Sequence, residues 1–503
     1  ARPGPVAPIV VRPQLNTSPV PSSAASGRFR PDIEGLRGVA VLLVVVFHAW
    51  PGLLGGGFFG VVVFFVRSGF LISGLLYREL GSTGHIDFRT FYARRIRRLL
   101  PAAALALLVT FLLSAWLLSP LVLPRVTGDG VAAALSVANI RFALASGDYF
   151  AAVATPSPFL HYWSLSVEEQ FYLVWPATLL LIARLGGRRL LGPAVLTIAV
   201  LSLSLALVGT EVAAGWAFYS LPTRAWQLAV GGLLAIMALE RFRRGGVSAL
   251  LGLVGWVGLA AVLLAGVIFD DLLAYPGWWA LLPTLGAVLV ISGGDRRGGP
   301  GLLLGLAPIR FLGRISYALY LWHWPLLILP VAAWGEQLPG WARLALVGLA
   351  VVIATASTLL LEEPIRRGTT RFSGHALRAA APPLAGLALA VVVGAGVSYM
   401  VAQRELDQLG GQVATAAEPP QDVEGDIVIE GLDEEPEPAT TPAASPRPAP
   451  SAAASAEAQQ LAEPTPQATK KPTKKPKKTP KPTPKPTPDW RLPEDVKPSV
   501  VAA

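Results

Sequence analysis

Apolar stretches long enough to cross a membrane recur through the first 400 or so residues, and they constrain the fold more than any other feature. A helix needs about 20 mostly apolar residues to span the hydrocarbon core of a bilayer. The composition, 53% hydrophobic and 15% charged, agrees with this reading. The sequence therefore predicts an all-α, polytopic transmembrane helix bundle with about eleven spans, at residues 38–54, 58–77, 99–118, 166–183, 190–209, 216–238, 248–268, 278–293, 315–333, 340–361 and 379–401.

Arginine clusters occupy alternate loops between these stretches. They contain Arg28, Arg30 and Arg37, then Arg94, Arg95, Arg97 and Arg98, then Arg184, Arg188 and Arg189, then Arg241, Arg243 and Arg244, then Arg296, Arg297, Arg310 and Arg314, then Arg366, Arg367 and Arg371. The positive-inside rule places the N-terminus in the cytoplasm and residues after 402 outside. It explains the net charge of +10 better than binding to nucleic acid does. Segment 131–147 is too short and polar for a span, and is expected to be a re-entrant or interfacial helix.

The two ends differ in composition from the apolar part. Residues 1–27 are rich in Pro, Ser and Ala and lack a signal-peptide pattern, so they predict a disordered cytoplasmic leader. Residues 403–503 contain an acidic stretch, an Ala/Pro/Ser stretch and KKPTKKPKKTPKPTPKPTP, which predicts a disordered extracytoplasmic linker that favours polyproline II. The chain has no cysteine, so neither a disulfide nor a cysteine-ligated metal is available.

The first span, RPDIEGLRGVAVLLVVVFHAW, contains two residues capable of chemistry. Arg37 and His48 are eleven positions apart, which brings them to nearly the same face of a helix, about 16 Å apart along its axis. An intramembrane histidine titrates near neutrality and is suited to act as a general base. The alternative is a histidine at a helix end, hydrogen-bonded to the backbone.

The stretch FYARRIRRLLP precedes the third span and contains four arginines, Arg94, Arg95, Arg97 and Arg98. Such a cluster can bind phosphates through bidentate hydrogen bonds. It can equally be a topology determinant without a ligand. A phosphorylated donor arriving from the cytoplasm would require a site of this kind.

HYWSLSVEEQFYLVWP, residues 161–176, enters the fourth span from the outer side. Glu168 and Glu169 are expected near the start of this helix, with Ser164 and Ser166 as candidate caps, and the carboxylates would then interact with the helix dipole. The other interpretation is a polar outer mouth shared with His161 and His48. No metal-binding, P-loop or nucleophile-elbow motif is present, so no metal is predicted.

Several motifs, taken together and in order, resemble the acyltransferase 3 family of integral-membrane enzymes. They are RPDIEGLRGVAVLLVVVFH, GGFFGVVVFFVRSGFLIS, FYARRIRRLLP, HYWSLSVEEQFYLVWP, LPTRAWQLAVGGLLA and FLGRISYALYLWHWP, followed by EEPIRR. The resemblance implies a ten-helix acyltransferase domain at residues 28–372 and one additional transmembrane helix at 373–402. It also implies transfer of an acyl group, usually acetyl from acetyl-CoA, across the membrane to a sugar hydroxyl of an extracytoplasmic or lipid-linked glycan.

The resemblance also assigns roles to residues. The family's paired arginine and histidine fall on Arg37 and His48, and its carboxylate motif falls approximately on Glu168 and Glu169. Its acyl-CoA motif falls on the arginines already identified, Arg94, Arg95, Arg97 and Arg98. The expected partners are acyl-CoA on the cytoplasmic side, an outer glycan acceptor and membrane lipids, with no nucleic acid. His48 is expected to deprotonate the sugar hydroxyl, and a transient acyl-histidine is the alternative.

Three positions depart from the family pattern. Val62 stands where the family has an aspartate, Gln227 where it has a glutamate, and Arg67 where it has an aliphatic residue. Arg67 is expected either to pair with Glu168, Glu169 or an anionic substrate group, or to face lipid and impair the enzyme. These departures support one other reading, an inactive membrane anchor for an outer SGNH-type domain, and the final residues DWRLPEDVKPSVVAA resemble the segment that leads into such a domain. A transporter is a further alternative, because a helix bundle with a polar axis could move glycan or acyl groups without chemistry.

Overall fold

The computed structural model describes residues 29–147, 155–241, 250–270, 274–335, 337–367 and 376–416, and these contain helices and connecting loops but no strand. The predicted leader at 1–27, and the predicted linker from residue 417 on, lie outside the described residues. The described helices and short helical turns are α1 Pro31–Ala49, η1 Gly57–Phe59, α2 Gly60–Thr83, α3 Phe88–Leu117, α4 Leu123–Ala134, α5 Ala138–Ala145, α7 Tyr162–Gly186, η2 Arg188–Leu190, α8 Leu191–Val212, α9 Ala214–Tyr219, α10 Leu221–Arg241, α11 Leu250–Ile268, η4 Trp278–Ala280, α12 Leu281–Gly293, α13 Gly301–Leu304, α14 Ala307–Trp334, α15 Gly340–Ser357, η5 Thr358–Glu362, α16 Glu363–Arg367 and α17 Ala376–Ala416.

The all-α prediction is confirmed, and each of the eleven predicted spans falls on a helix. In the described part of the chain, seven helices are long and apolar enough to cross a membrane, and these include α2, α3, α8, α11, α14, α15 and α17. The other four predicted spans lie on α1, α7, α10 and α12. Helix α12 is short, whereas α1, α7 and α10 carry charged residues. The count of eleven therefore stays a prediction.

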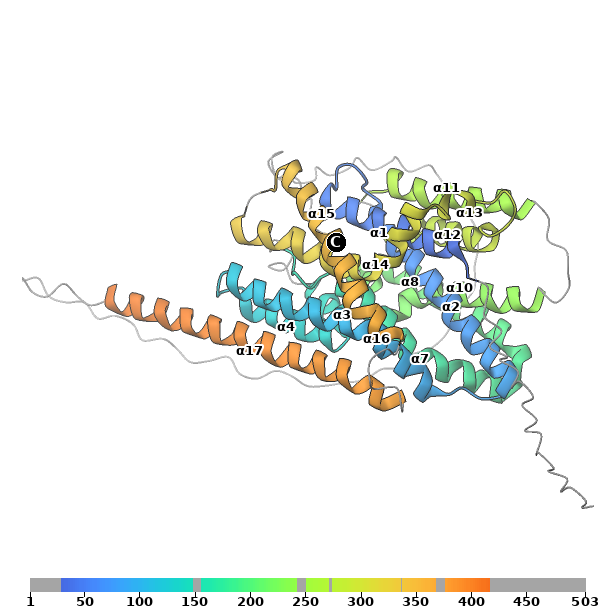
Figure 1. The fold of residues 1–503 in the computed structure, drawn as a ribbon, viewed down its shortest axis with the longest axis horizontal. Helices are drawn as coiled ribbons and strands as arrows, with labels where there is room; N and C mark the ends of the chain where they lie inside the picture. Colours follow the sequence, from blue (N-terminus) through green and yellow to red (C-terminus); the bar gives the residue numbers. More distant parts are fainter. Residues whose placement is uncertain are drawn as a thin grey trace, which may run out of the picture. The chain divides into compact units, whose positions relative to one another are not determined.

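Two further segments refine the sequence-based expectations. Segment 131–147 forms the end of α4 and all of α5, which are separated by Ser136 at a φ of 57°, so neither helix is long enough to span a bilayer. Helix α17 continues to Ala416, past residue 402, where the linker was expected to begin. The reason is local, because AQRELDQL, residues 402–409, consists mostly of strong helix formers. Helix α17 packs along α3 and also contacts α4 (Figure 1).

Helix α1 packs along α14, and small residues allow the two backbones to approach closely. A Cβ on Gly38 would lie 2.2 Å from the carbonyl oxygen of Ile309, and one on Gly313 would lie 1.8 Å from that of Glu34. Small residues at such crossings are typical of helix packing in membranes. Contacts advance together along both helices, from Glu34 and Gly313 to His48 and His323, so α1 and α14 run parallel.

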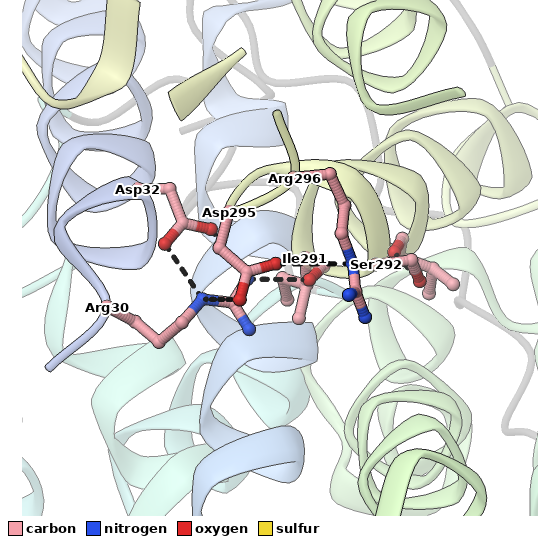
Figure 2. Close-up of polar contacts among 7 residues, drawn as sticks. Arg30, Asp32, Ile291, Ser292, Asp295 and Arg296 are labelled. Carbon is pink, nitrogen blue, oxygen red and sulfur yellow. Dashed lines mark hydrogen bonds and ion pairs between the residues drawn. The ribbon is translucent and has the colours of Figure 1, made fainter. Parts of the chain in front are cut away.

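A charged cluster fixes the start of α1 against the end of α12, as Figure 2 shows. Arg30 donates two hydrogen bonds to the buried carboxylate of Asp32, at 2.8 and 2.6 Å, and a third to the carbonyl oxygen of Ile291 at 2.8 Å. The carboxylate of Asp295 forms ion pairs with two arginines: its Oδ2 atom lies 3.6 Å from Nε of Arg30, and its Oδ1 atom lies 3.7 Å from Nε of Arg296. Burial alone would lower the pKa of the Arg30 guanidinium, but its hydrogen bonds to Asp32 and the charge of that residue raise it. The cluster therefore holds α1 in place at the end where Arg37 lies.

Candidate functional site

Three neighbouring cavities in the described bundle contain the candidate site residues. The basic vestibule has about 1040 Å³ of space not filled by protein atoms, the central cavity about 700 Å³ and the histidine pocket about 350 Å³. The walls of the basic vestibule include Arg37, Arg98, Arg310, Arg314, Glu362 and Arg366. The central cavity includes Arg37, Arg67, Arg95, Arg98, Glu168 and Tyr172. The histidine pocket includes His48, Phe58, His161, Trp163, Tyr320 and Trp324.

The three cavities share walls and therefore lie in series. Arg37, Arg98 and Tyr317 line both the basic vestibule and the central cavity. Val61 and Tyr320 line both the central cavity and the histidine pocket. Arg37 thus borders the first two cavities and His48 the third, as expected for residues at two levels of one face of α1. The three cavities follow one another from an arginine-lined end of the bundle to a histidine-lined end.

Only two of the four arginines of FYARRIRRLLP line the central cavity. Arg95 and Arg98 are three residues apart and therefore share one face of α3. Arg95 lies over the ring of Tyr172, with its guanidinium carbon 4.7 Å from the ring centroid. Arg94 is exposed, and Arg97 donates to the carbonyl oxygen of Ala93 at 3.3 Å. Neither of these two residues lines any of the three cavities.

Arg67 lines the central cavity, so of the two placements expected for this residue the structure shows the one inside the bundle. Its Nε atom is buried without a hydrogen-bond partner in the described residues, and so is the Nε atom of Arg37. Its charge lies near those of Arg37 and Arg98, which repel it, and near Glu168, which attracts it. The cavity thus carries four arginines and, among its described lining residues, a single carboxylate.

That carboxylate, Glu168, accepts hydrogen bonds from the hydroxyl groups of Ser68 and Tyr172. Of the two readings for Glu168, a polar mouth shared with His48 differs from what the structure shows: Glu168 lines the central cavity, about 10 Å further along the axis of α7 than His161, whereas His48 and His161 line the histidine pocket. Because α7 begins at Tyr162, Ser164 and Ser166 lie inside the helix and do not cap it. Glu169 lines none of the three cavities but is close enough to Arg95 and Arg98 to interact with their charges.

Val62 and Gln227, the other two departures from the family pattern, lie outside the three cavities. Both side chains are fully buried. Val62 belongs to an apolar cluster with Leu36 and Val66, whereas neither amide atom of Gln227 has a hydrogen-bond partner in the described residues. The side chains at these two positions are therefore not part of the walls of the three cavities.

The histidine pocket is built from rings held by hydrogen bonds. Nδ1 of His48 lies 3.0 Å from Nε2 of His323, and Nδ1 of His323 lies 3.0 Å from the carbonyl oxygen of Leu319. The ring of Trp324 packs edge-on against His48 at a centroid distance of 4.6 Å, and its indole nitrogen donates to the carbonyl oxygen of Ser157. The side chain of His48 is thus oriented by two neighbours on α14.

His161 and Tyr320 complete this pocket. The hydroxyl of Tyr320 donates to the carbonyl oxygen of His161 at 3.1 Å and lies 2.7 Å from the hydroxyl of Ser164. His161 and His48 thus line one pocket, without Glu168 or Glu169. Both ring nitrogens of His161 are buried without a partner in the described residues.

Sequence reasoning did not identify His323 as a site residue, although LWHWP belongs to one of the motifs that resemble the family. The signal was available, because His323 is a histidine inside an apolar helix and meets the criterion that selected His48. No group of three or more His, Asp or Glu side chains in the described residues could hold a metal ion.

Comparison with known proteins identifies several relatives that are O-acetyltransferases. The chain is 30% identical over 354 residues to the peptidoglycan O-acetyltransferase OatA of Listeria monocytogenes, which covers 68% of this chain and 56% of the relative. It is 32% identical over 361 residues to the putative peptidoglycan O-acetyltransferase YrhL of Bacillus subtilis, covering 69% and 56%. It is 29% identical over 351 residues to the O-acetyltransferase OatA of Staphylococcus aureus, covering 68% and 58%.

The chain thus spans little more than half the length of these relatives. No solved structure matches it. The model of the acyltransferase domain matches residues 30–362, which include all the cavity walls named above except Arg366. The chain therefore belongs to the acyltransferase 3 family.

Proposed function

We propose that the chain transfers an acyl group, acetyl in the simplest case, from acyl-CoA at the arginine-lined end of the bundle to a sugar hydroxyl at the histidine-lined end. Residues 28–372 form the catalytic unit in this proposal, and residues 373–402 an additional span. The acceptor is a cell-envelope glycan, as the names of the relatives suggest.

The observation that carries the proposal is the series of three cavities with shared walls. A CoA thioester combines a polyanionic head with a long, thin arm, so it requires cationic groups at one end of a path and a reactive group at the other. Arg37, Arg98 and Arg310 supply cations in the basic vestibule, and arginine suits phosphate because it donates bidentate hydrogen bonds. Val61 and Tyr320 lie where the arm would pass from the central cavity to the histidine pocket.

The chemistry assigned to His48 is removal of a proton from the acceptor hydroxyl. The oxygen then attacks the thioester carbonyl carbon, the carbon–sulfur bond breaks, and the thiolate takes the proton from the imidazole. General-base catalysis of this kind contributes about 10²- to 10⁴-fold to a rate. A transient acyl-histidine would use the same side chain and is an alternative outcome of the experiments below.

The arrangement of loop arginines supports a cytoplasmic donor and an outer acceptor. Arg310, Arg314 and Arg366 lie in clusters expected on the cytoplasmic side, and all three line the basic vestibule. Arg37 lies on the same wall. The N-terminus is therefore assigned to the cytoplasm and the segment after α17 to the outer side.

The test uses membranes that contain this chain, acetyl-CoA labelled in its acetyl group, and soluble peptidoglycan fragments as acceptor. We expect labelled ester on the glycan, together with thioester cleavage that depends on the glycan. His48→Ala should lower the rate by about 10²- to 10⁴-fold. His85→Gln is the matched control, because His85 is exposed in the loop between α2 and α3 and should leave the rate unchanged.

Three results would contradict the proposal in different ways. Transfer by a folded His48→Ala protein at the parent rate would exclude both chemical roles of His48. Movement of glycan or acyl groups without thioester cleavage would identify a transporter. Absence of transfer from the parent when an added SGNH-type domain is supplied would favour an inactive anchor.

A further inference from the structure

We propose that His323 is a positioning residue that fixes the tautomer of His48, so that Nε2 of His48 is the basic atom presented to the acceptor hydroxyl. The inference rests on the proposed function and deepens it. It depends on a chain of two contacts, His48 to His323 and His323 to the backbone of Leu319.

The first step is the protonation of His323. Its Nδ1 lies 3.0 Å from the carbonyl oxygen of Leu319, and a carbonyl oxygen can only accept a hydrogen bond. Nδ1 of His323 must therefore carry a hydrogen. In neutral imidazole one ring nitrogen is a donor and the other an acceptor, so Nε2 of His323 presents a lone pair. The ring is fully buried, and no carboxylate contacts it among the described interactions, so the neutral form is favoured.

The second step transfers this constraint to His48. Nδ1 of His48 faces Nε2 of His323 at 3.0 Å, and because Nε2 accepts, Nδ1 of His48 must donate. Nε2 of neutral His48 then carries the lone pair. His48 is partly exposed and lines the histidine pocket, where the acceptor would lie in this proposal. The lone pair on Nε2 of His48 is therefore the one available to the acceptor hydroxyl.

The third step concerns the proton taken from the acceptor. When Nε2 of His48 accepts it, the ring becomes a cation whose Nδ1–H points at a neutral acceptor, Nε2 of His323. That hydrogen bond becomes charge-assisted and therefore stronger in the charged state than in the neutral one. Stabilisation that appears only when charge develops lowers the barrier and not the energy of the bound substrate. His323 thus acts on the rate of the chemical step through His48, without touching the donor.

The remaining contacts of the pocket restrict the two rings to this geometry. Trp324 packs against His48 and is itself held by the carbonyl oxygen of Ser157. Tyr320 lies 5.4 Å from His323 by ring centroids and is held by the carbonyl oxygen of His161. Backbone carbonyls therefore anchor both neighbours of the histidine pair as well as His323.

The test compares two substitutions at one position. His323→Phe keeps a planar ring but removes the acceptor, whereas His323→Gln can place its Oε1 atom near the former position of Nε2. We expect His323→Phe to lower kcat by about 10²-fold, near the lower end of the range for general-base catalysis, with KM for acetyl-CoA unchanged. His323→Gln should restore a substantial part of kcat. His85→Gln again serves as the control, and the thermal unfolding midpoint of each variant in detergent shows whether it folds.

Two results would overturn the inference. If folded His323→Phe keeps the parent kcat, the tautomer of His48 does not depend on His323. If the Phe and Gln variants lose kcat equally while both unfold at the parent temperature, His323 contributes ring packing and not an acceptor. His48→Ala is measured in the same assay, so failure of the inference about His323 can be distinguished from failure of the proposed function. If the proposed function is wrong, His48→Ala keeps the parent transfer rate; if only the role of His323 is wrong, His48→Ala still loses transfer.

Discussion

The central cavity and the histidine pocket share a wall but are built in opposite ways. In the central cavity the charged groups outnumber their partners, and the Nε atoms of both Arg37 and Arg67 are buried without one. In the histidine pocket, both ring nitrogens of His161 also lack a partner among the described residues, but His323 is held by a backbone carbonyl and His48 by His323. A buried cation without a partner is destabilising when no anion is present, whereas the hydrogen bonds from Leu319 through His323 to His48 fix the geometry of the two rings. Under the proposed function, the arginines bind the donor and the histidines carry out the chemical step.

This division predicts which kinetic constant each cavity controls. Substitutions in the central cavity and basic vestibule should change KM for the donor, because they remove binding made equally in the ground state and the transition state. Substitutions in the histidine pocket should change kcat. A central-cavity variant that changed only kcat would contradict the comparison.

The largest effect on donor binding is expected at Arg98, because Arg98 lines both the basic vestibule and the central cavity. Losing hydrogen bonds to a charged group costs about 1.5–3 kcal/mol, which corresponds to roughly a 10- to 100-fold change in affinity. Arg98→Gln should therefore raise KM for acetyl-CoA by that factor with little change in kcat, measured by initial rates in membranes.

The matched variant lies in the same motif. Arg94→Gln removes the same charge and shortens the side chain by the same amount as Arg98→Gln does. However, Arg94 is exposed and lines none of the three cavities. Its KM should stay near that of the parent. Equal effects of the two substitutions would show that the motif acts as a diffuse positive surface and not as a cavity wall.

A smaller effect is expected at Arg67, where the charge lies among other arginines. Arg67→Ile removes a buried nitrogen without a partner and relieves repulsion from Arg37 and Arg98, so the thermal unfolding midpoint should rise. It also removes one cation available to the donor, so KM should rise by about three- to tenfold, the equivalent of roughly 1 kcal/mol. Higher transfer with an unchanged KM would instead show that Arg67 impairs the enzyme.

The sequence predicted the helices well because a bilayer fixes the length of an apolar segment, and each of the eleven predicted segments falls on a helix. It predicted that Arg37 and His48 share one face of α1, because eleven residues complete slightly more than three whole turns of a helix, and α1 is continuous between them. Both predictions depend only on local geometry. They required no knowledge of which helices are neighbours.

The errors arose where neighbours matter. Nothing in FYARRIRRLLP tells which face of α3 turns inward, so Arg95 and Arg98 could not be separated from Arg94 and Arg97. His323 is a candidate site residue because it contacts His48, which lies 275 positions away in the sequence. Only the close packing of α1 and α14 brings the two rings together. The sequence also left the level of Glu168 open, because its position beside Ser68 in the central cavity depends on the packing of α7 against α2.

The smallest predicted effect concerns Asp87, which caps α3 from the loop before it. Its carboxylate accepts a hydrogen bond from the backbone nitrogen of Thr90 at 3.0 Å. Hydrogen bonds from the side chain and backbone of Thr90 lower the pKa of this carboxyl from its ordinary value of 3.8. A lowered pKa means that the stabilisation is complete above the ordinary value and is lost as the pH falls through the lower value of the folded protein.

Asp87→Asn gives the matched control, because asparagine caps a helix about as well as aspartate but does not titrate. The difference in thermal unfolding midpoint between the parent and Asp87→Asn should therefore shrink or reverse as the pH is lowered through this window, whereas Asp87→Ala should be less stable than the parent at neutral pH. Since the first turns of α3 orient Arg95 and Arg98, Asp87→Ala should raise KM for the donor slightly and leave kcat unchanged. A loss of kcat in Asp87→Ala would mean that a change near the arginines of α3 reaches the histidine pocket. Donor binding and the chemical step would then be less separate than the different hydrogen-bond networks of the two cavities indicate.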